Sequence, residues 1–168
     1  MKIRLGLLFA FAMWNMCSWA ALAGDSDGKP DLKAITDVAA ADKAAILAAV
    51  RDYQEGQFTS NPERVKRALH PNLFKYRVKP LRKSSQTETL DILNAQWLIA
   101  FAAENEAWAK GRSVRELNIV YQDKAIAVVH AVADDFYDVC MLAKINGAWR
   151  ITAAAWDFHE GFADWKRK

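Results

Sequence analysis

The sequence predicts a single α+β domain in which helices cover one face of a curved, mostly antiparallel sheet. Helix-like apolar patterns occupy the earlier part of the chain, and strand-like runs occupy the last third. The composition, 52% apolar and 26% charged over 168 residues, is typical of one globular domain. Because the chain has only two cysteines, a disulfide scaffold is excluded.

The first 23 residues have the pattern of an export signal. Lys2 and Arg4 precede a mostly apolar segment, residues 5–16, and residues 21–23 form a small-x-small cleavage motif. We therefore expect cleavage before Gly24 and a periplasmic or secreted mature protein. No later apolar run reaches the roughly 18 residues that span a bilayer, so no membrane contact is expected after cleavage.

Charge and composition set the expected partners and domain bounds. Of 23 Lys and Arg, two lie in the signal, which leaves 21 against 20 Asp and Glu. A nearly neutral exported protein is not expected to bind nucleic acid. Residues 24–40 are small and polar and predict a flexible leader, followed by one domain at 41–160 and a tail at 161–168.

Two helices are expected at the start of the domain. From Asp42, an apolar stripe that includes Tyr53 predicts a helix that ends at Gly56. A short second helix is expected after Asn61, which can cap it, and should end at His70-Pro71.

A strand and a long helix are expected next. Residues 74–79 alternate apolar and basic side chains, which predicts a half-buried edge strand with its Lys and Arg facing outward. Ser85 and Glu88 have the spacing of a capping box. A long apolar helix is therefore expected from Leu90 to Trp108, with Gly111 as its stop.

The last third predicts an antiparallel meander. Two-residue turns are expected at Asp134-Asp135 and Asn146-Gly147, the second being a strong hairpin signal. The expected strands cover residues 114–121, 125–133, 136–145 and 149–158.

This register sorts the side chains onto two faces. Ala131 should lie opposite Asp138, and Cys140 opposite Ala153. One face is then rich in alanine around a single carboxylate, which leaves room for an apolar pocket between helices and sheet. The opposite face, with Trp156, is a large apolar surface.

Asp138 is the main candidate for chemistry. In an apolar pocket its carboxylate could act as a general base or as a hydrogen-bond anchor. The alternative is a solvated or Arg-paired Asp near a strand end. Cys140, the only cysteine after the signal, is expected to be an inert buried side chain.

Several motifs resemble one known superfamily. They are Tyr53-x-x-Gly56, Asn61-Pro62-Glu63-Arg64, Ala68-Leu69-His70-Pro71, Lys75, Asp138, Leu142-Ala143-Lys144-Ile145-Asn146-Gly147, Trp149-Arg150-Ile151 and Trp156. Over roughly residues 40–158 the chain is similar to the nuclear transport factor 2-like superfamily, and within it to the putative lumazine-binding branch. The resemblance implies the cone-shaped fold of ketosteroid isomerases, scytalone dehydratases and polyketide cyclases. It also implies a homodimer through the outer sheet face. Val139 and Ala153 stand where the branch usually has Tyr and Asn.

Other chemistries find little support. His159-Glu160 begins like a zinc-protease motif, but position 163 is Ala163 where a second His is needed, so no metal is expected. No phosphate or dinucleotide loop is present, and we expect no cofactor. A basic run is expected to be the solvated side of a helix and strand, with an anionic ligand or partner as the alternative. Its members are Arg64, Lys66, Arg67, Lys75, Arg77, Lys79, Arg82 and Lys83.

Together these observations predict an exported, dimeric protein that binds a small apolar or aromatic molecule, without established catalysis. The expected ligand-binding residues are Tyr53, His70, Tyr76, Trp97 and Asp138. One alternative is an isomerase, dehydratase or cyclase in which Asp138 is the base and Tyr53 or Tyr76 polarises a carbonyl. Another is a dimerisation or adaptor module with a filled cavity, below roughly 300 Å³.

Overall fold

The computed structural model describes residues 32–82 and 85–160, with side chains described from Ala39 onward. The predicted signal at 1–23 and tail at 161–168 lie outside these residues. The chain divides into two units, Met1–Ile35 and Thr36–Lys168, and the fold below is that of the second. No helix in the described ranges is long and apolar enough to cross a bilayer.

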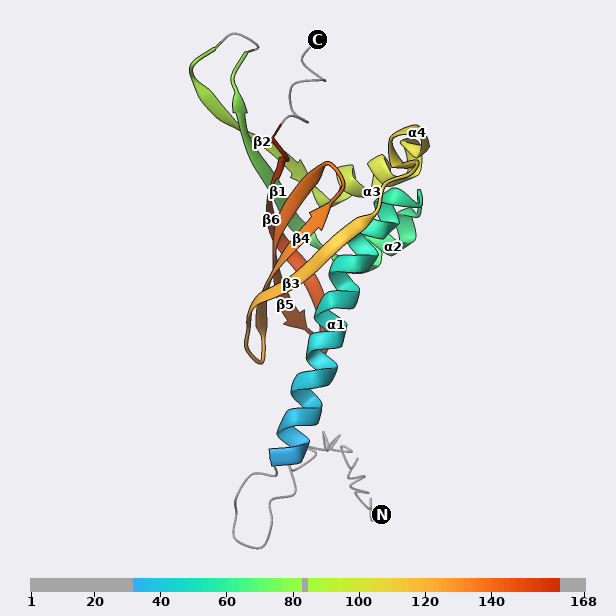
Figure 1. The fold of residues 1–168 in the computed structure, drawn as a ribbon, viewed down its shortest axis with the longest axis vertical. Coiled ribbons are helices and arrows are strands. Elements are labelled where there is room, and N and C mark those ends of the chain that lie inside the picture. Colours follow the sequence, from blue (N-terminus) through green and yellow to red (C-terminus); the bar gives the residue numbers. More distant parts are fainter. Residues whose placement is uncertain (1–31, 83–84, 161–168) are drawn as a thin grey trace, which may run out of the picture. The chain divides into compact units, whose positions relative to one another are not determined.

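Helices and strands follow one another in the predicted order, with one extra strand and one extra short helix (Figure 1). The elements are α1 (Leu32–Phe58), α2 (Pro62–Ala68), β1 (Leu69–Pro80), β2 (Glu88–Asn94), α3 (Ala95–Glu104), α4 (Glu106–Ala109), β3 (Val114–Gln122), β4 (Ile126–Ala133), β5 (Phe136–Ile145) and β6 (Ala148–Phe158). The strand order in the sheet is β2-β1-β6-β5-β4-β3. Among these described strands, only β1 and β6 pair in parallel.

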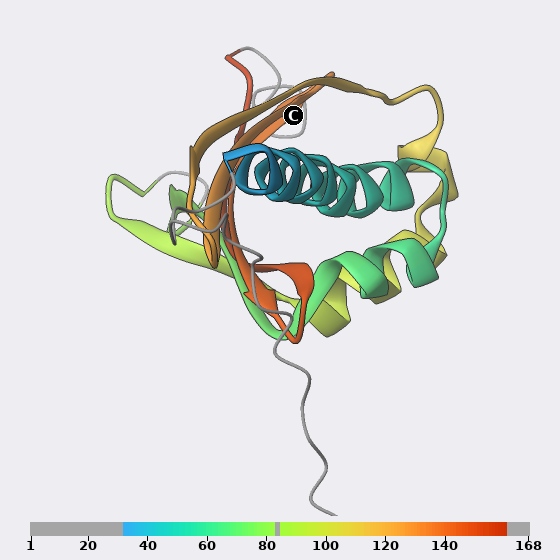
Figure 2. The same cartoon turned by 90° about the horizontal axis from the view of Figure 1, so that it is seen from below.

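The sheet curves around α1, as Figure 2 shows. The apolar stripe of α1, with Ile46 and Val50 fully buried, packs in one core cluster with Val129 and Ile151 of the sheet. Burying each such side chain stabilises the fold by about 1.5–3 kcal/mol. The α+β class with helices inside a curved sheet is thus confirmed.

The C-terminal meander agrees with the prediction for most of its length. The expected strand 136–145 coincides with β5, and Ala131 lies opposite Asp138. Asn146 and Gly147 form a two-residue turn with φ of 52° and 80°. Such positive angles suit Asn and Gly and match the twist of a hairpin.

The first helix is longer at both ends than predicted. It begins at Leu32, so residues 32–40, expected in a flexible leader, include helix. It also continues through Gly56 to Phe58. Gly56 is instead needed for close packing, because a Cβ there would lie 2.8 Å from Val65 Cγ2 of α2.

The predicted helix from Leu90 to Trp108 is wrong in its first part. Residues 88–94 form β2, which pairs antiparallel with β1. Asp91 of this strand accepts hydrogen bonds from Arg77 and Lys79 of β1. These contacts depend on the pairing of the two strands, which a helix over residues 88–94 would not make. The helix starts only at α3, where the Asn94 side chain caps the backbone N–H of Trp97 at 2.8 Å.

The two faces of β1 are the reverse of the prediction, and β1 is not an edge strand. It lies between β2 and β6. Phe74 and Val78 are 49% and 51% exposed, whereas Lys75 is only 4% exposed. The inward Lys75 is tolerated because the interior supplies a carboxylate for it, and a buried charge without such a partner is very costly.

A bulge in β6 changes the predicted register. Leu142 lies opposite Ile151, but Met141 lies opposite Ala153, which leaves Thr152 as an extra residue. Cys140 consequently faces Ala154 instead of Ala153. Because each one-residue shift turns every later side chain to the other face, Trp156 lies on the inner face rather than the predicted outer one.

Candidate functional site

A buried ion pair stands at the centre of the inner face. Lys75 Nζ lies 2.6 Å from Asp138 Oδ1, and Asp138 is fully buried. The side-chain amide of Gln54 donates to the other oxygen, Asp138 Oδ2, at 3.2 Å. Asp138 is therefore buried, as expected, but it is neither unpaired, solvated nor paired with Arg.

Tyr53 completes the polar cluster. Lys75 Nζ donates a hydrogen bond to the Tyr53 hydroxyl at 2.7 Å. Burial, followed by the nearby charge of Asp138, raises the pKa of Tyr53 well above its usual value. Burial, and then Asp138, likewise raises the pKa of the Cys140 thiol. Tyr53 therefore remains a neutral phenol, and Cys140 remains a thiol.

Aromatic rings surround the ammonium group of Lys75. Its Nζ lies 4.7 Å from the ring centroid of Trp156, 5.2 Å from Phe136 and 5.3 Å from Tyr53. Cation–π attraction is strongest in such a desolvated place and adds to the ion pair. The guanidinium of Arg77 also lies 4.7 Å from the Trp156 centroid.

Local sequence patterns place each member of this cluster. The two-residue period of β1 sets Lys75, Arg77 and Lys79 on the inner face. Asp138 lies opposite Trp156 across the β5–β6 pair, so both side chains reach the same region of the sheet. Helix α1 supplies Tyr53 from the side that faces the sheet.

A large hollow adjoins the cluster. Its volume is about 1000 Å³. The aromatic residues that line it are Trp97, Phe101, Trp108, Phe136, Trp156 and Phe158. Its polar lining includes Gln57, Lys75, Arg77, Lys79 and Asp91. A volume of this size lies well above the range expected for a filled cavity.

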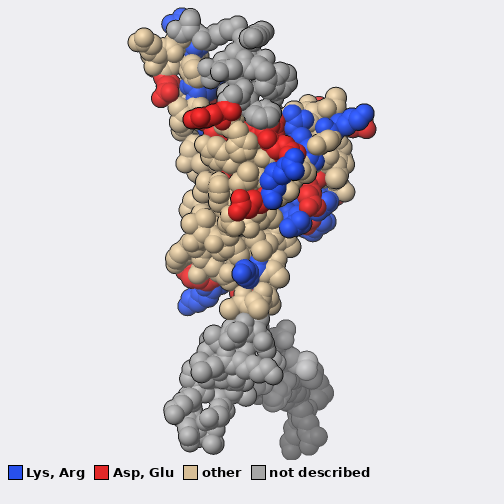
Figure 3. Space-filling view, in the orientation of Figure 1, with Lys and Arg blue, Asp and Glu red and all other residues tan. Residues whose placement is uncertain are grey.

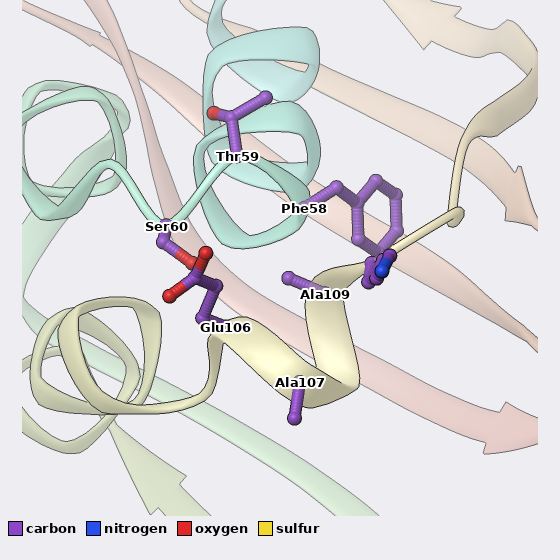
Figure 4. Close-up of a pocket in the computed structure, with 7 residues that line it drawn as sticks. Phe58, Thr59, Ser60, Glu106, Ala107 and Ala109 are labelled. Carbon is purple, nitrogen blue, oxygen red and sulfur yellow. The ribbon is translucent and has the colours of Figure 1, made fainter.

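A second, smaller hollow of about 510 Å³ lies between the end of α1 and α4. Figure 4 shows the Ser60 and Glu106 side chains pointing toward one another there. Thr59, Ala107 and Lys110 also line it, and it shares no lining residue with the larger hollow. Because Lys75 of the ion pair lines the larger hollow and not the smaller one, the larger hollow is the candidate site.

The predicted site residues fall into three groups. Tyr53 and Asp138 are brought together behind the hollow, and Trp97 lines it directly. Tyr76 lies on the opposite face of β1, stacked on Phe74 at 5.9 Å. His70 is half-buried outside the hollow, where its Nδ1 accepts from the backbone N–H of Asn72 at 3.2 Å.

Sequence reasoning missed Lys75, Gln54, Gln57 and Trp156 as site residues. The alternating pattern of β1 contains Lys75, but the pattern alone favours the outer face for it. The bulge in β6 turns Trp156 to the inner face. A buried Asp138 itself requires a cation nearby, and this requirement is the signal that could have pointed to a basic residue of β1.

The basic run is mostly neutralised rather than free. Arg64 pairs with Asp52 at 3.0 Å, and Arg67 pairs with the same carboxyl group at 2.9 Å. Arg77 and Lys79 share Asp91. Blue and red atoms accordingly lie side by side on the charged part of the face in Figure 3. The predicted solvated side of a helix and edge strand is thus largely a set of ion pairs.

No metal centre is visible in the described part of the chain, which contains no cluster of three or more His, Cys, Asp or Glu able to hold an ion. The polar cluster of Tyr53, Lys75 and Asp138 holds one amine and one carboxylate. These groups form an ion pair and a hydrogen bond with one another.

Comparison with known proteins agrees with this geometry. A family model described as putative lumazine-binding matches residues 41–157. The chain belongs to this family. No curated protein matches the sequence significantly.

Solved structures similar to this member of the putative lumazine-binding family share its fold. A nuclear transport factor 2-like protein of unknown function from Silicibacter pomeroyi has a TM-score of 0.56 and 16% identity, over 72% of this chain and 98% of its own. One from Shewanella baltica has a TM-score of 0.54 and 17% identity, over 73% and 97%. A protein described as a putative scytalone dehydratase, from Novosphingobium aromaticivorans, has a TM-score of 0.51 and 12% identity, over 74% and 88%. At these identities the likeness shows the fold alone, the nuclear transport factor 2-like cone.

Proposed function

We propose that this protein binds a small apolar or aromatic molecule in the large hollow. The observation that carries the proposal is the hollow of about 1000 Å³, whose walls hold six aromatic side chains beside a buried polar cluster. Ligand sites are typically concave and mostly apolar, with a few fixed polar groups. The family name and the fold are consistent with ligand binding.

The position of Asp138 favours binding over proton abstraction. A general base must reach the proton that it removes, directly or through one water. Both oxygens of Asp138 are engaged, one by Lys75 and one by Gln54, and Asp138 is not among the lining residues of the hollow. Its role in the proposal is to hold Lys75 in place.

Export and dimerisation are further parts of the proposal. Export is supported by the pattern of residues 1–23 and by the small residues before Gly24. Dimerisation through the outer sheet face is supported by Ile126, Val139 and Met141, which are 47%, 37% and 49% exposed on adjacent strands. A contiguous apolar face of this kind is typical of an interface.

Native mass spectrometry of protein purified from its own host tests ligand binding. We expect a noncovalent adduct that is lost on denaturation. In Leu93→Trp, a new ring placed on the lining should reduce the adduct strongly, because it occupies the hollow. The matched control, Ala107→Trp in the smaller hollow, should keep it. An adduct that survives Leu93→Trp and disappears in Ala107→Trp would place binding elsewhere and contradict the proposal.

A further inference from the structure

We infer that Lys75 forms a reversible imine with an aromatic aldehyde in the large hollow. This inference rests on the proposed function and deepens it, because it names the chemical class of the ligand and the atom that holds it. Three features support it: a buried primary amine on the lining, a carboxylate that can take its proton, and an unpaired donor for the carbonyl oxygen.

Lys75 is an amine placed inside an aromatic hollow. The residue is only 4% exposed, yet it lines the hollow. Lysines that form imines typically lie in such apolar surroundings, because burial favours the reactive neutral amine over the ammonium group. Lys79, the other lysine of the described lining, has a 41% exposed side chain and is paired with Asp91. Lys75 is therefore the lysine suited to this reaction.

Two oxygen atoms hold the Lys75 amine, and one of them can take its proton. Asp138 Oδ1 lies 2.6 Å from Nζ, and the Tyr53 hydroxyl accepts a hydrogen bond from Nζ at 2.7 Å. Transfer of one proton from Nζ to Oδ1 converts the ion pair into a neutral amine and a carboxylic acid. Because both charged groups are costly to bury, a low-polarity interior favours this transfer more than water does.

The indole of Trp156 can receive the carbonyl oxygen. Its Nε1 is buried and has no hydrogen-bond partner among the described residues. Lys75 Nζ lies 4.7 Å from the centroid of the Trp156 ring, and both residues line the hollow. A carbonyl oxygen that accepts from Nε1 relieves the unpaired donor, and its carbon becomes more reactive toward the amine.

The lining favours an aldehyde on a flat ring. Trp97 and Phe101 stack with their centroids 5.0 Å apart, and such rings attract another aromatic ring beyond simple burial. Around Nζ the space is crowded, since the centroids of Tyr53, Phe136 and Trp156 all lie within 5.3 Å. A carbonyl carbon that carries only hydrogen beside its ring approaches such an amine more easily than that of a ketone.

The reaction balances without any further reagent. After the proton has moved to Asp138, the Lys75 nitrogen bonds to the carbonyl carbon while the C=O double bond opens, and a proton passes from nitrogen to oxygen. The resulting hydroxyl lies on the carbon bonded to Nζ and so is near Asp138 Oδ1. Asp138 returns its proton as the C–O bond breaks, which releases water and leaves a protonated imine beside the carboxylate.

The charges of the site suit a neutral ligand and this cationic product. Carboxylates outnumber cations on the lining, so an anionic ligand is disfavoured and a neutral aldehyde is not. The carboxylates are those of Glu88, Asp91, Asp157 and Glu160, and the cations are Lys75, Arg77 and Lys79. The protonated imine keeps one positive charge next to Asp138, so the reaction leaves no buried charge uncompensated.

Reduction with cyanoborohydride in the presence of 2-naphthaldehyde tests the inference on the native protein. An imine is hydrolysed when the protein is denatured, but the reduced amine is stable. Intact mass should increase by the mass of the aldehyde less one oxygen atom. Peptide mapping should place the label on Lys75 at an aldehyde concentration about tenfold below that needed for any other lysine, because the hollow holds the ring beside the amine. The ketone 2-acetylnaphthalene should label Lys75 far more slowly.

Two variants and a control connect the label to the hollow. Lys75→Arg keeps a positive charge beside Asp138 but lacks the primary amine, so labelling at low aldehyde should be lost. Leu93→Trp keeps Lys75 but fills the hollow from the position opposite it on β2, and should lower labelling about tenfold. Lys144→Arg is the matched control, since Lys144 pairs with Asp42 at 2.7 Å but does not line the hollow, and it should label normally.

The outcomes separate the inference from the proposed function. A label spread over other lysines with Lys75 unmodified would overturn the imine, and so would labelling of Lys75 that is unchanged in Leu93→Trp. Since mapping and Leu93→Trp both retain Lys75, the test remains decisive if Lys75→Arg does not fold. If Lys75 is not labelled but the native protein carries an adduct in the hollow, the imine fails and ligand binding stands. If neither is found, the proposed function itself fails.

Discussion

Asp138 and Lys75 form the buried pair on which the inner face of the sheet depends. The two side chains belong to residues that are 0% and 4% exposed, and their charged atoms lie 2.6 Å apart. A buried ion pair contributes little net stability when it is intact, but loss of one partner leaves an uncompensated charge. Each partner therefore depends on the other to remain both charged and buried.

A double-mutant cycle tests the pair. Asp138→Asn and Lys75→Met should each lower the free energy of unfolding by about 3–5 kcal/mol, because each leaves one charge buried alone. The double variant should lose much less than the sum of the two, since it removes both charges. Urea unfolding measures all four proteins.

The control for this cycle is Asp157→Asn combined with Lys75→Met. Asp157 lies on the same sheet but accepts from the backbone N–H of Phe158. Its effect should simply add to that of Lys75→Met. Additive effects at Asp138 as well would contradict a pair that acts as a unit.

At the scale of elements, the β1–β2 hairpin is joined by a shared carboxylate. Asp91 of β2 accepts from Arg77 at 3.3 Å and from Lys79 at 2.8 Å. Burial alone would raise the pKa of Asp91, but the hydrogen bonds from Lys79 and Arg77 outweigh it and hold the pKa below its usual 3.8. The stability of this hairpin therefore depends on pH, because Asp91 must be ionised to pair with Lys79 and Arg77.

The direction of the pH effect follows from this lowered pKa. The stabilisation is fully present above the pKa of the unfolded chain, about 4, and is lost as the pH falls through the lower folded value. The free energy of unfolding should thus decrease between about pH 5 and pH 2. In Asp91→Asn the decrease should be shallower but still present, because the pKa values of Asp42 and Asp134 are also lowered. An unchanged slope in Asp91→Asn would contradict this role.

At the scale of the whole molecule, the sheet presents one face to the helices and one apolar face outward. If two copies associate through that face, a charge placed at its centre should separate them. Met141→Lys should convert a dimer to a monomer in sedimentation velocity, because it would bury an unpaired ammonium. Leu81→Lys, at a 55% exposed position near the tip of the hairpin, is the control and should remain dimeric. A monomeric native protein would contradict the proposed dimer.

The sequence by itself determined the class of fold and most of the meander. Period-two runs, the Asn146-Gly147 turn and the apolar stripe of α1 are local signals, and each lies within a short window of the chain. The same register correctly placed Asp138 opposite Ala131 on the alanine-rich inner face. The face of the sheet on which Asp138 lies is therefore predictable from the strand pattern alone.

Only the tertiary structure decided which side chains surround Asp138. Alternation in β1 is equally compatible with Lys75 facing inward or outward, and the choice depends on Asp138, which lies far away in the sequence. The bulge that turns Trp156 inward is similarly invisible in β6 itself, because it is set by pairing with β5. Residues 88–94 became a strand because β1 offered an edge and cations for Asp91. Local patterns thus determined the elements, and contacts between distant segments determined the site.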